Sequence, residues 1–211
     1  MKLFEYEAKR TLAEYGIPTS KGGLATSPRE AREVAGNLKP PFVVKAQVLV
    51  AGRGKSGGIL FVDSIEQVEN AGERLLGMQI KGIPIRSLWI EEKIQIKREL
   101  YFGITIDRFN QSYVVIASSV GGMDIEEIAA KSPETVVKSL INPQLGLHSF
   151  HARQIARKMG YAGSQLSELG RIFEKLYSVC MEYDAELIEM NPLVETVDGR
   201  FVAADARIIV D

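Results

Sequence analysis

Apolar positions recur at helical spacing in some segments of the chain and form short strand-like runs in others. Between residues 4 and 15 the spacing is three or four, which predicts an amphipathic helix. Ser27 and Ser64 each stand three residues before a Glu or Gln, a pattern that predicts capped helix starts. Short runs rich in Val, Ile and Phe surround these helices and predict strands. Residues 21–94 are therefore expected to form a compact α+β unit in the order strand, helix, strand, strand, helix, strand.

The remainder of the chain shows the same mixture of helical and strand patterns. The predicted strands cover 88–94, 98–107, 111–119, 185–190, 193–197 and 201–209, while helices start at Ser132, cover 151–159 and follow a stripe from Leu166 to Cys180. Asp198-Gly199 lies between two apolar runs, which indicates a hairpin at the end of the chain.

The composition is that of an ordinary globular protein. The 211 residues are 45% hydrophobic and 25% charged, with a net charge of -1, so bulk charge does not indicate nucleic-acid binding. The single cysteine, Cys180, excludes an internal disulfide framework and suits a reducing compartment. We find no signal-peptide pattern and no apolar run of membrane-spanning length. We expect a cytoplasmic protein, or one of the mitochondrial matrix if a transit peptide has been removed.

A basic, glycine-dense loop separates two apolar runs within residues 42–62. Its sequence is Ala51-Gly52-Arg53-Gly54-Lys55-Ser56-Gly57-Gly58. The Walker pattern fails because Leu49 stands where its first glycine belongs, and the dinucleotide fingerprint fails because a strand follows instead of a helix. A strand, a glycine loop and a strand are typical of a flap over nucleotide phosphates. A flexible hairpin turn is the alternative.

Lys45 lies within the first apolar run, where a lysine is costly unless a partner neutralises it. One interpretation is a cation that binds the α- and β-phosphates of a nucleotide. The other is a position on the solvated face of the strand.

Two glutamates, Glu91 and Glu99, flank a possible connector between two sheets. Exposed strand glutamates are common, so solvated side chains are one interpretation. In the functional interpretation the strand that ends near Glu91 meets the adenine edge through its backbone, and Glu99 accepts the ribose hydroxyls.

Asn191 and Asp205 fall on opposite sides of the predicted terminal hairpin, at similar distances from its Asp198-Gly199 turn. Two oxygen-bearing side chains that face each other can hold Mg²⁺, which prefers one or two protein oxygens. Ordinary polar residues on a surface hairpin are the alternative. The two histidines, His148 and His151, lack the partners of a zinc site and are interpreted as polar residues at a helix entrance.

Several of these stretches occur in the order and spacing of one known family. They are Leu3-Phe4-Glu5-Tyr6-Glu7-Ala8-Lys9, Val43-Val44-Lys45-Ala46-Gln47-Val48, Gly52-Arg53-Gly54-Lys55-Ser56-Gly57-Gly58, Arg98-Glu99-Leu100-Tyr101 and Ile188-Glu189-Met190-Asn191-Pro192-Leu193. Taken together, they resemble the ATP-grasp portion of the β subunit of succinyl-CoA synthetase, over essentially the whole chain.

The resemblance implies an α+β ATP-grasp fold of two subdomains with the nucleotide site between them. Residues 1–20 and 95–211 would form the larger subdomain, and 21–94 the smaller, inserted one. The implied site residues are Lys45, Gly52, Arg53, Gly54, Glu91, Ile94 and Glu99 for ATP or GTP, with Asn191 and Asp205 for Mg²⁺.

The resemblance also implies a partner and a reaction. A phosphohistidine on the α subunit would carry the phosphoryl group, and Glu189 would help to receive it. The family joins succinate and CoA to succinyl-CoA and releases a nucleoside diphosphate and phosphate. Because family β subunits continue into a C-terminal ligase domain, we expect a fragment or a split subunit. It would bind nucleotide and Mg²⁺ without completing the ligase reaction.

Other functions share these motifs. Malate–CoA ligases, citrate–CoA ligases and ATP-citrate lyases have their substrate determinants outside these residues, so the acid stays open. A different ATP-grasp carboxylate ligase, acting through an acyl-phosphate, and a non-catalytic interaction module are further alternatives.

Overall fold

The computed structural model describes residues 1–50 and 52–211, so that Ala51 of the glycine-dense loop lies outside the described residues. The chain divides into a larger unit, Met1–Thr19 with Gln95–Asp211, and a smaller unit, Ser20–Ile94. Each unit has its own sheet and hydrophobic core. The chain passes from the larger to the smaller unit after Thr19, one residue before the expected boundary. It returns to the larger unit after Ile94, where the boundary was expected.

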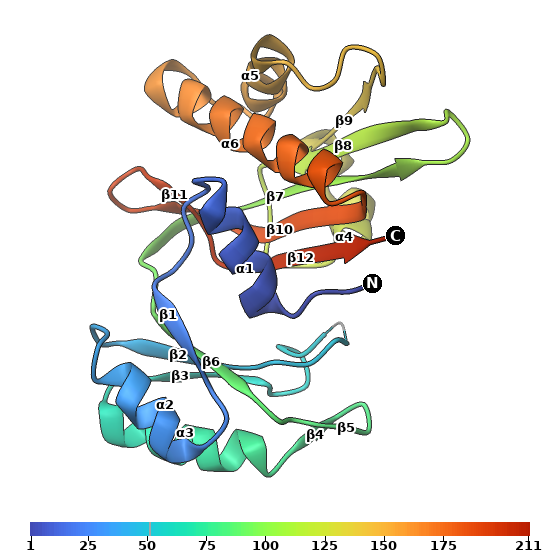
Figure 1. The fold of residues 1–211 in the computed structure, drawn as a ribbon. Coiled ribbons are helices and arrows are strands. Elements are labelled where there is room, and N and C mark those ends of the chain that lie inside the picture. Colours follow the sequence, from blue (N-terminus) through green and yellow to red (C-terminus); the bar gives the residue numbers. More distant parts are fainter. Residues whose placement is uncertain (51) are drawn as a thin grey trace. The chain divides into compact units, whose positions relative to one another are not determined.

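The smaller unit is an antiparallel sheet with two helices on one face (Figure 1). The strand order is β1 (Gly22–Ala25), β6 (Leu88–Glu92), β2 (Phe42–Ala46) and β3 (Ile59–Val62), and the helices are α2 (Pro28–Ala35) and α3 (Ile65–Leu76). The expected order of elements is confirmed. A short ribbon of β4 (Gln79–Ile80) and β5 (Ile83–Pro84) was not expected.

Both helices of the smaller unit begin at the predicted serine caps. Ser27 Oγ accepts the Glu30 N–H at 3.2 Å, and the Glu30 carboxylate in turn accepts the Thr26 N–H at 2.7 Å. Ser64 and Gln67 repeat this arrangement at the start of α3. The caps satisfy N–H groups that a helix start otherwise leaves without partners.

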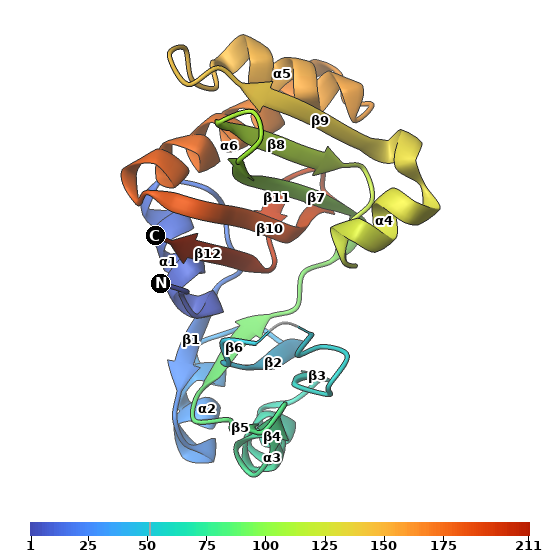
Figure 2. The same cartoon turned by 90° about the vertical axis from the view of Figure 1, so that its right-hand side faces the viewer.

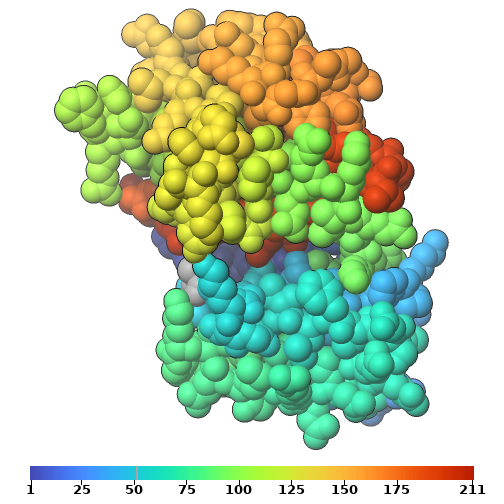
Figure 3. Space-filling view, turned by 180° about the vertical axis from the view of Figure 1, so that it is seen from behind, coloured from blue at the N-terminus to red at the C-terminus, as the bar shows by residue number. Residues whose placement is uncertain are grey.

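The larger unit is built on a six-stranded antiparallel sheet. Its elements are α1 (Glu5–Glu14), β7 (Ile96–Asp107), β8 (Ser112–Ser118), α4 (Ile125–Lys131), a 3-10 turn η1 (Pro133–Thr135), β9 (Val136–Ile141), α5 (Ser149–Lys158), α6 (Gly163–Glu182), β10 (Ala185–Thr196), β11 (Phe201–Ala203) and β12 (Ala206–Val210). The strand order is β11-β10-β7-β8-β9, and β12 pairs with β10 beyond the end of β11. Figure 2 shows α4 at the end of the sheet where β8 ends and β9 begins, and Figure 3 shows this segment on the outer surface, in yellow.

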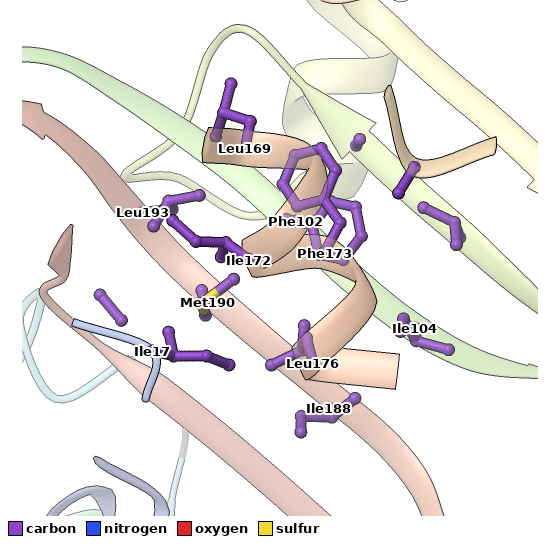
Figure 4. Packing of buried hydrophobic residues seen from close by; sticks show 14 of the residues in the cluster. Ile17, Phe102, Ile104, Leu169, Ile172, Phe173, Leu176, Ile188, Met190 and Leu193 are labelled. Carbon is purple, nitrogen blue, oxygen red and sulfur yellow. The ribbon is translucent and has the colours of Figure 1, made fainter. Parts of the chain in front are cut away.

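One face of this sheet is covered by α6, whose apolar stripe forms the centre of the core (Figure 4). The Phe173 ring of α6 stacks on the Phe102 ring of β7 with centroids 3.6 Å apart, and both residues are buried. The core side chains labelled around them are Ile17, Ile104, Leu169, Ile172, Leu176, Ile188, Met190 and Leu193. On β7, even-numbered residues therefore face α6 and odd-numbered residues face the other way.

An extra residue interrupts the pairing of β10 with β7. Met190 pairs with Phe102 and Leu193 pairs with Leu100, so three steps on one strand oppose two on the other. This β-bulge keeps both Met190 and Leu193 in the core, although strict alternation would place them on opposite faces. The residues that absorb the irregularity are Asn191 and Pro192.

Three expectations for the larger unit are wrong in detail. The helix expected from Ser132 is only the turn η1, because Val136 and Val137 are β-branched and continue as β9. The two strands expected over 185–190 and 193–197 are the single strand β10, since the bulge joins them. The last predicted strand is broken at Ala204 and Asp205 into β11 and β12.

The stacked rings of Phe102 and Phe173 are expected to stabilise the larger unit. Phe173→Ala removes a buried ring and leaves a cavity, so we expect a loss of about 3–5 kcal/mol in the free energy of unfolding. Urea unfolding followed by circular dichroism measures it. The matched control is Phe109→Ala, because Phe109 is 94% exposed and should change stability by less than about 0.5 kcal/mol. Equal losses in the two variants would contradict this packing.

Candidate functional site

The buried lysine of the smaller unit forms an ion pair within its own sheet. Lys45 is 6% exposed, and its Nζ lies 2.6 Å from Oε1 of Glu91, which is 2% exposed. Every residue of β2 is buried, so the alternative of a solvated Lys45 is wrong. Removing one partner of such a pair leaves a buried charge uncompensated, at a cost of about 3–5 kcal/mol.

The Glu91 carboxylate also accepts hydrogen bonds from two neutral groups. Ser20 Oγ donates at 2.5 Å and Trp89 Nε1 donates at 2.8 Å, both to Oε2. The interpretation of Glu91 as an exposed strand glutamate is therefore wrong. Donors on both oxygens favour the charged carboxylate and fix its orientation towards Lys45.

The glycine-dense loop closes the hairpin of β2 and β3. Ala46 N–H donates to Gly58 O at 2.8 Å, and Gly58 N–H donates to Arg53 O at 2.8 Å. The Arg53 guanidinium is buried and donates to Ala46 O at 3.2 Å, which ties the loop to the end of β2. Gly52 has a φ of +81°, a conformation that glycine adopts without strain.

The β4–β5 ribbon brings a further cation to this loop. A Cβ placed on Gly52 would lie 4.0 Å from the Nζ of Lys81, and one on Gly58 would lie 2.6 Å from Ile80 Cδ1. Sequence reasoning did not find Lys81, because a two-residue strand has no periodic signal. Gly54, the remaining predicted loop glycine, lies near Ile59.

The other nucleotide candidates are divided between the units. Ile94 is the last residue of the smaller unit, two residues beyond β6, and Glu99 lies on β7 of the larger unit. The expectation that Glu91 and Glu99 flank a connector between two sheets is confirmed.

In the larger unit the structure brings Asn191 and Asp205 together. The Asn191 N–H donates to Asp205 O at 3.2 Å, which confirms that the two residues lie opposite each other. The Asn191 side chain binds the loop after β8, accepting the Gly122 N–H at 2.9 Å and donating to Met123 O at 2.9 Å. The bulge in β10 is what releases this side chain from the core.

These donors fit Mg²⁺. Asn191 Oδ1 has a second lone pair beside the one used by Gly122, and Asp205, whose backbone carbonyl meets Asn191, would contribute carboxylate oxygens. Within residues 1–50 and 52–211 there is no group of three or more His, Cys, Asp or Glu side chains that could hold a metal ion. A site with one amide and one carboxylate suits Mg²⁺, which keeps several waters and phosphate oxygens.

Glu99 converges on the same loop as Asn191. A Cβ on Gly122 would lie 2.1 Å from Glu99 Oε2, and a Cβ on Gly121 would lie 2.3 Å from Leu100 O. Only glycines allow so close an approach of the loop to β7. Gly122 also has a φ of +76°.

Glu189 lies on the sheet face that α6 leaves uncovered. Its carboxylate accepts the Tyr101 hydroxyl at 2.9 Å and lies 3.5 Å from Nη1 of Arg207. Burial, followed by the negative charge of Glu189 and the hydrogen bond to it, raises the pKa of Tyr101 far above its ordinary value. The Tyr101 hydroxyl therefore stays protonated and donates to Glu189.

A protein-family model described as an ATP-grasp domain matches residues 2–195. The chain belongs to the ATP-grasp domain family.

Two curated relatives of this ATP-grasp domain are named succinate--CoA ligase [ADP-forming] subunit beta. The chain is 42% identical to the protein of Pyrobaculum calidifontis and 44% identical to that of Roseiflexus sp., over its full length and 56% of theirs. A third relative, subunit beta 2 of Archaeoglobus fulgidus, is 43% identical over 55% of its length. The chain thus spans about half the length of these relatives.

Solved structures share the fold of this ATP-grasp domain at low identity. The dinucleotide forming acetyl-coenzyme A synthetase 1 of Ca. Korarchaeum cryptofilum matches with a TM-score of 0.78 at 20% identity, covering all of this chain and 93% of that one. The ATP citrate lyase of Methanothrix soehngenii matches with a TM-score of 0.75 at 21% identity, covering all of this chain and 51% of that one.

The ATP-grasp domain also has a cavity that lies apart from the predicted site residues. A cavity of about 500 Å³ is lined by Ile106, Tyr113, Glu182, Tyr183, Asp184, Glu186, Val210 and Asp211, none of which is a predicted site residue.

Burial raises the pKa of the Cys180 thiol to about 12, which agrees with a packing role. None of the helices in the described part of the chain is long and apolar enough to cross a membrane.

The loop after β8 has a glycine whose neighbours are backbone atoms. Gly121→Ala places a Cβ 2.3 Å from the Leu100 carbonyl oxygen, which cannot rotate away, so we expect a loss of more than about 2 kcal/mol in unfolding free energy. Urea unfolding measures it. Gly77→Ala is the matched control, because the nearest atoms to its Cβ position lie at 3.5 Å, an ordinary contact. A Gly121→Ala loss no larger than that of the control would contradict the close approach.

Proposed function

We propose that this ATP-grasp domain binds Mg·ATP and serves as the nucleotide-binding part of a succinate–CoA ligase. It would exchange a phosphoryl group with a histidine of a partner α subunit. The observation that carries this proposal is the 42–44% identity of the whole chain to proteins named succinate--CoA ligase [ADP-forming] subunit beta. The same name favours ATP over GTP.

The smaller unit is proposed to bind the phosphates and the base. Lys45 would neutralise the α- and β-phosphates, and the backbone N–H groups of Gly52, Arg53 and Gly54 would bind phosphate oxygens. The backbone near Glu91 and Ile94 would meet the adenine edge. Because the Glu91 carboxylate is engaged with Lys45, its side chain orients the lysine instead of contacting the nucleotide.

The larger unit is proposed to hold the metal and the ribose. Asn191 and Asp205 would bind Mg²⁺, which neutralises charge on the phosphate oxygens when bound. Glu99 would accept the ribose hydroxyls, and Glu189 would accept the N–H of the incoming imidazole of the partner.

In the proposed transfer, the bond between the γ-phosphorus and the oxygen that bridges it to ADP breaks. A bond from that phosphorus to one imidazole nitrogen of the partner histidine forms, the bridging oxygen leaves with ADP and the bonding electron pair, and the proton on the other imidazole nitrogen passes to the Glu189 carboxylate. The residues of this chain contribute positioning and charge neutralisation, which are the main requirements of phosphoryl transfer. The partner and the remainder of the ligase would use the phosphohistidine to couple succinate and CoA to succinyl-CoA.

Two alternatives make different predictions. A ligase that forms an acyl-phosphate directly would not transfer the γ-phosphoryl group of ATP to a histidine of a succinate–CoA ligase α subunit, whereas the proposed enzyme would. An interaction module would bind no nucleotide. The likeness to the ATP citrate lyase and acetyl-coenzyme A synthetase structures concerns the fold and favours neither of their acids.

Calorimetric titration with Mg·ADP tests the proposal. The variant Lys45→Met is made in a Glu91→Gln background, so that no buried charge is left without its partner. We expect this double variant to bind at least tenfold more weakly than the unsubstituted chain, because a charge-assisted contact to phosphate contributes about 1.5–3 kcal/mol. Asp205→Asn should remove the tightening that Mg²⁺ produces.

The control for these titrations is Lys39→Met, since Lys39 is an exposed lysine of the smaller unit. Its affinity should match that of the unsubstituted chain. Failure of the unsubstituted chain to bind Mg·ADP would refute the proposed function. Unchanged affinity in the Lys45 variant would remove that residue from the site.

A further inference from the structure

Arg207 lies on the same sheet face as the proposed phosphoryl-transfer residues. It pairs with Glu189 across β12 and β10, and Glu189 pairs with Gly103 across β10 and β7. Tyr101 lies two residues from Gly103 and therefore on the same face, where a Cβ on Gly103 would be 2.7 Å from its hydroxyl. Gly103 thus leaves the room in which the Tyr101 hydroxyl reaches Glu189.

The hydrogen bonding of Arg207 is incomplete. Nη1 lies 3.5 Å from Glu189 Oε1, while Nε is buried and has no partner among the described residues. A buried N–H without an acceptor is uncommon in folded proteins and calls for an explanation. The side chain as a whole is 37% exposed, so part of it is open to a ligand although Nε itself is buried.

The chemistry of the Arg207 guanidinium indicates which ligand its accessible part would bind. Its planar fork of N–H donors matches the oxygens of a phosphoryl group, and its charge is retained at every relevant pH. Arg207 follows Asp205 by two residues and faces Glu189, so it lies next to both the proposed metal ligand and the proposed acceptor of the partner imidazole. The group that passes between ATP and that imidazole is the γ-phosphoryl group.

We propose that Arg207 binds the γ-phosphoryl group of ATP, with Glu189 holding its guanidinium in place; this inference rests on the proposed function. The guanidinium offsets the negative charge that Glu189 and Asp205 would otherwise present to the phosphoryl oxygens. Sequence inspection missed Arg207, because an arginine on a predicted strand is ordinary until its pairing with Glu189 is known.

The experiment compares three ligands by calorimetry: Mg·AMPPNP, Mg·ADP and AMP. The variants are Arg207→Met and Arg207→Lys, and the matched control is Arg200→Met. Arg200 belongs to the turn between β10 and β11, where its exposed side chain pairs with Asp198. Thermal melting of each variant reports whether it folds.

Arg207→Met should weaken Mg·AMPPNP about tenfold or more, while Mg·ADP and AMP stay within about twofold of the unsubstituted chain, since only the first carries a γ-phosphoryl mimic. Arg207→Lys keeps the charge without the fork and should lose a smaller factor for Mg·AMPPNP alone. If Arg207→Met does not fold, the same comparison of Mg·AMPPNP with Mg·ADP and AMP in Arg207→Lys tests the inference. Arg200→Met should bind all three ligands normally.

Equal weakening of all three ligands would show that Arg207 only supports the structure around Glu189, and would overturn the inference. Unchanged affinity for Mg·AMPPNP in both Arg207 variants would also overturn it, while leaving the proposed function standing. An unsubstituted chain that binds none of the ligands would overturn both.

Discussion

The β-bulge at Asn191 and Pro192 is the constraint on which the polar face of the larger unit depends. Strand alternation allows one side chain in two to leave the core, and β10 must bury both Met190 and Leu193. One extra residue reconciles these demands and frees Asn191 to bind the loop at Gly122. The same irregularity coincides with the break between β11 and β12 that contains Asp205. Asn191, Asp205 and Glu99 are therefore placed by core packing as much as by their own contacts.

The smaller unit uses a different device, a buried ion pair. Burying Lys45 and Glu91 removes both charges from water, and the gain from their contact only partly offsets that cost. A pair of apolar residues of similar size would stabilise the sheet at least as well. The proposed role of Lys45 in ligand binding would account for this cost, and Glu91, held by Ser20 and Trp89, fixes the position of the lysine.

Prediction from sequence succeeds where the signal is local. The serine caps at Ser27 and Ser64, the turn at Asp198-Gly199 and the stripe along α6 each follow from neighbouring residues and are confirmed. The burial of Lys45 could not be decided, because strand alternation does not say whether both faces of a strand are covered. Glu5 and Lys9 illustrate the same limit, since this pair looks solvated on an amphipathic helix yet is buried at 3.0 Å. Tyr101 and Arg207 need the pairing register of three strands, which sequence spacing alone does not supply.

The most direct test of this account is where a divalent ion lies when nucleotide is bound. Mn²⁺ can replace Mg²⁺ and broadens the NMR signals of nearby amides. With Mn·ADP added well below the protein concentration, the amide signals of Gly122, Asn191 and Asp205 should broaden, and Asp205→Asn should prevent it. If those three signals stay sharp while signals of the cavity residues Glu182, Asp184 and Asp211 broaden, the account is contradicted.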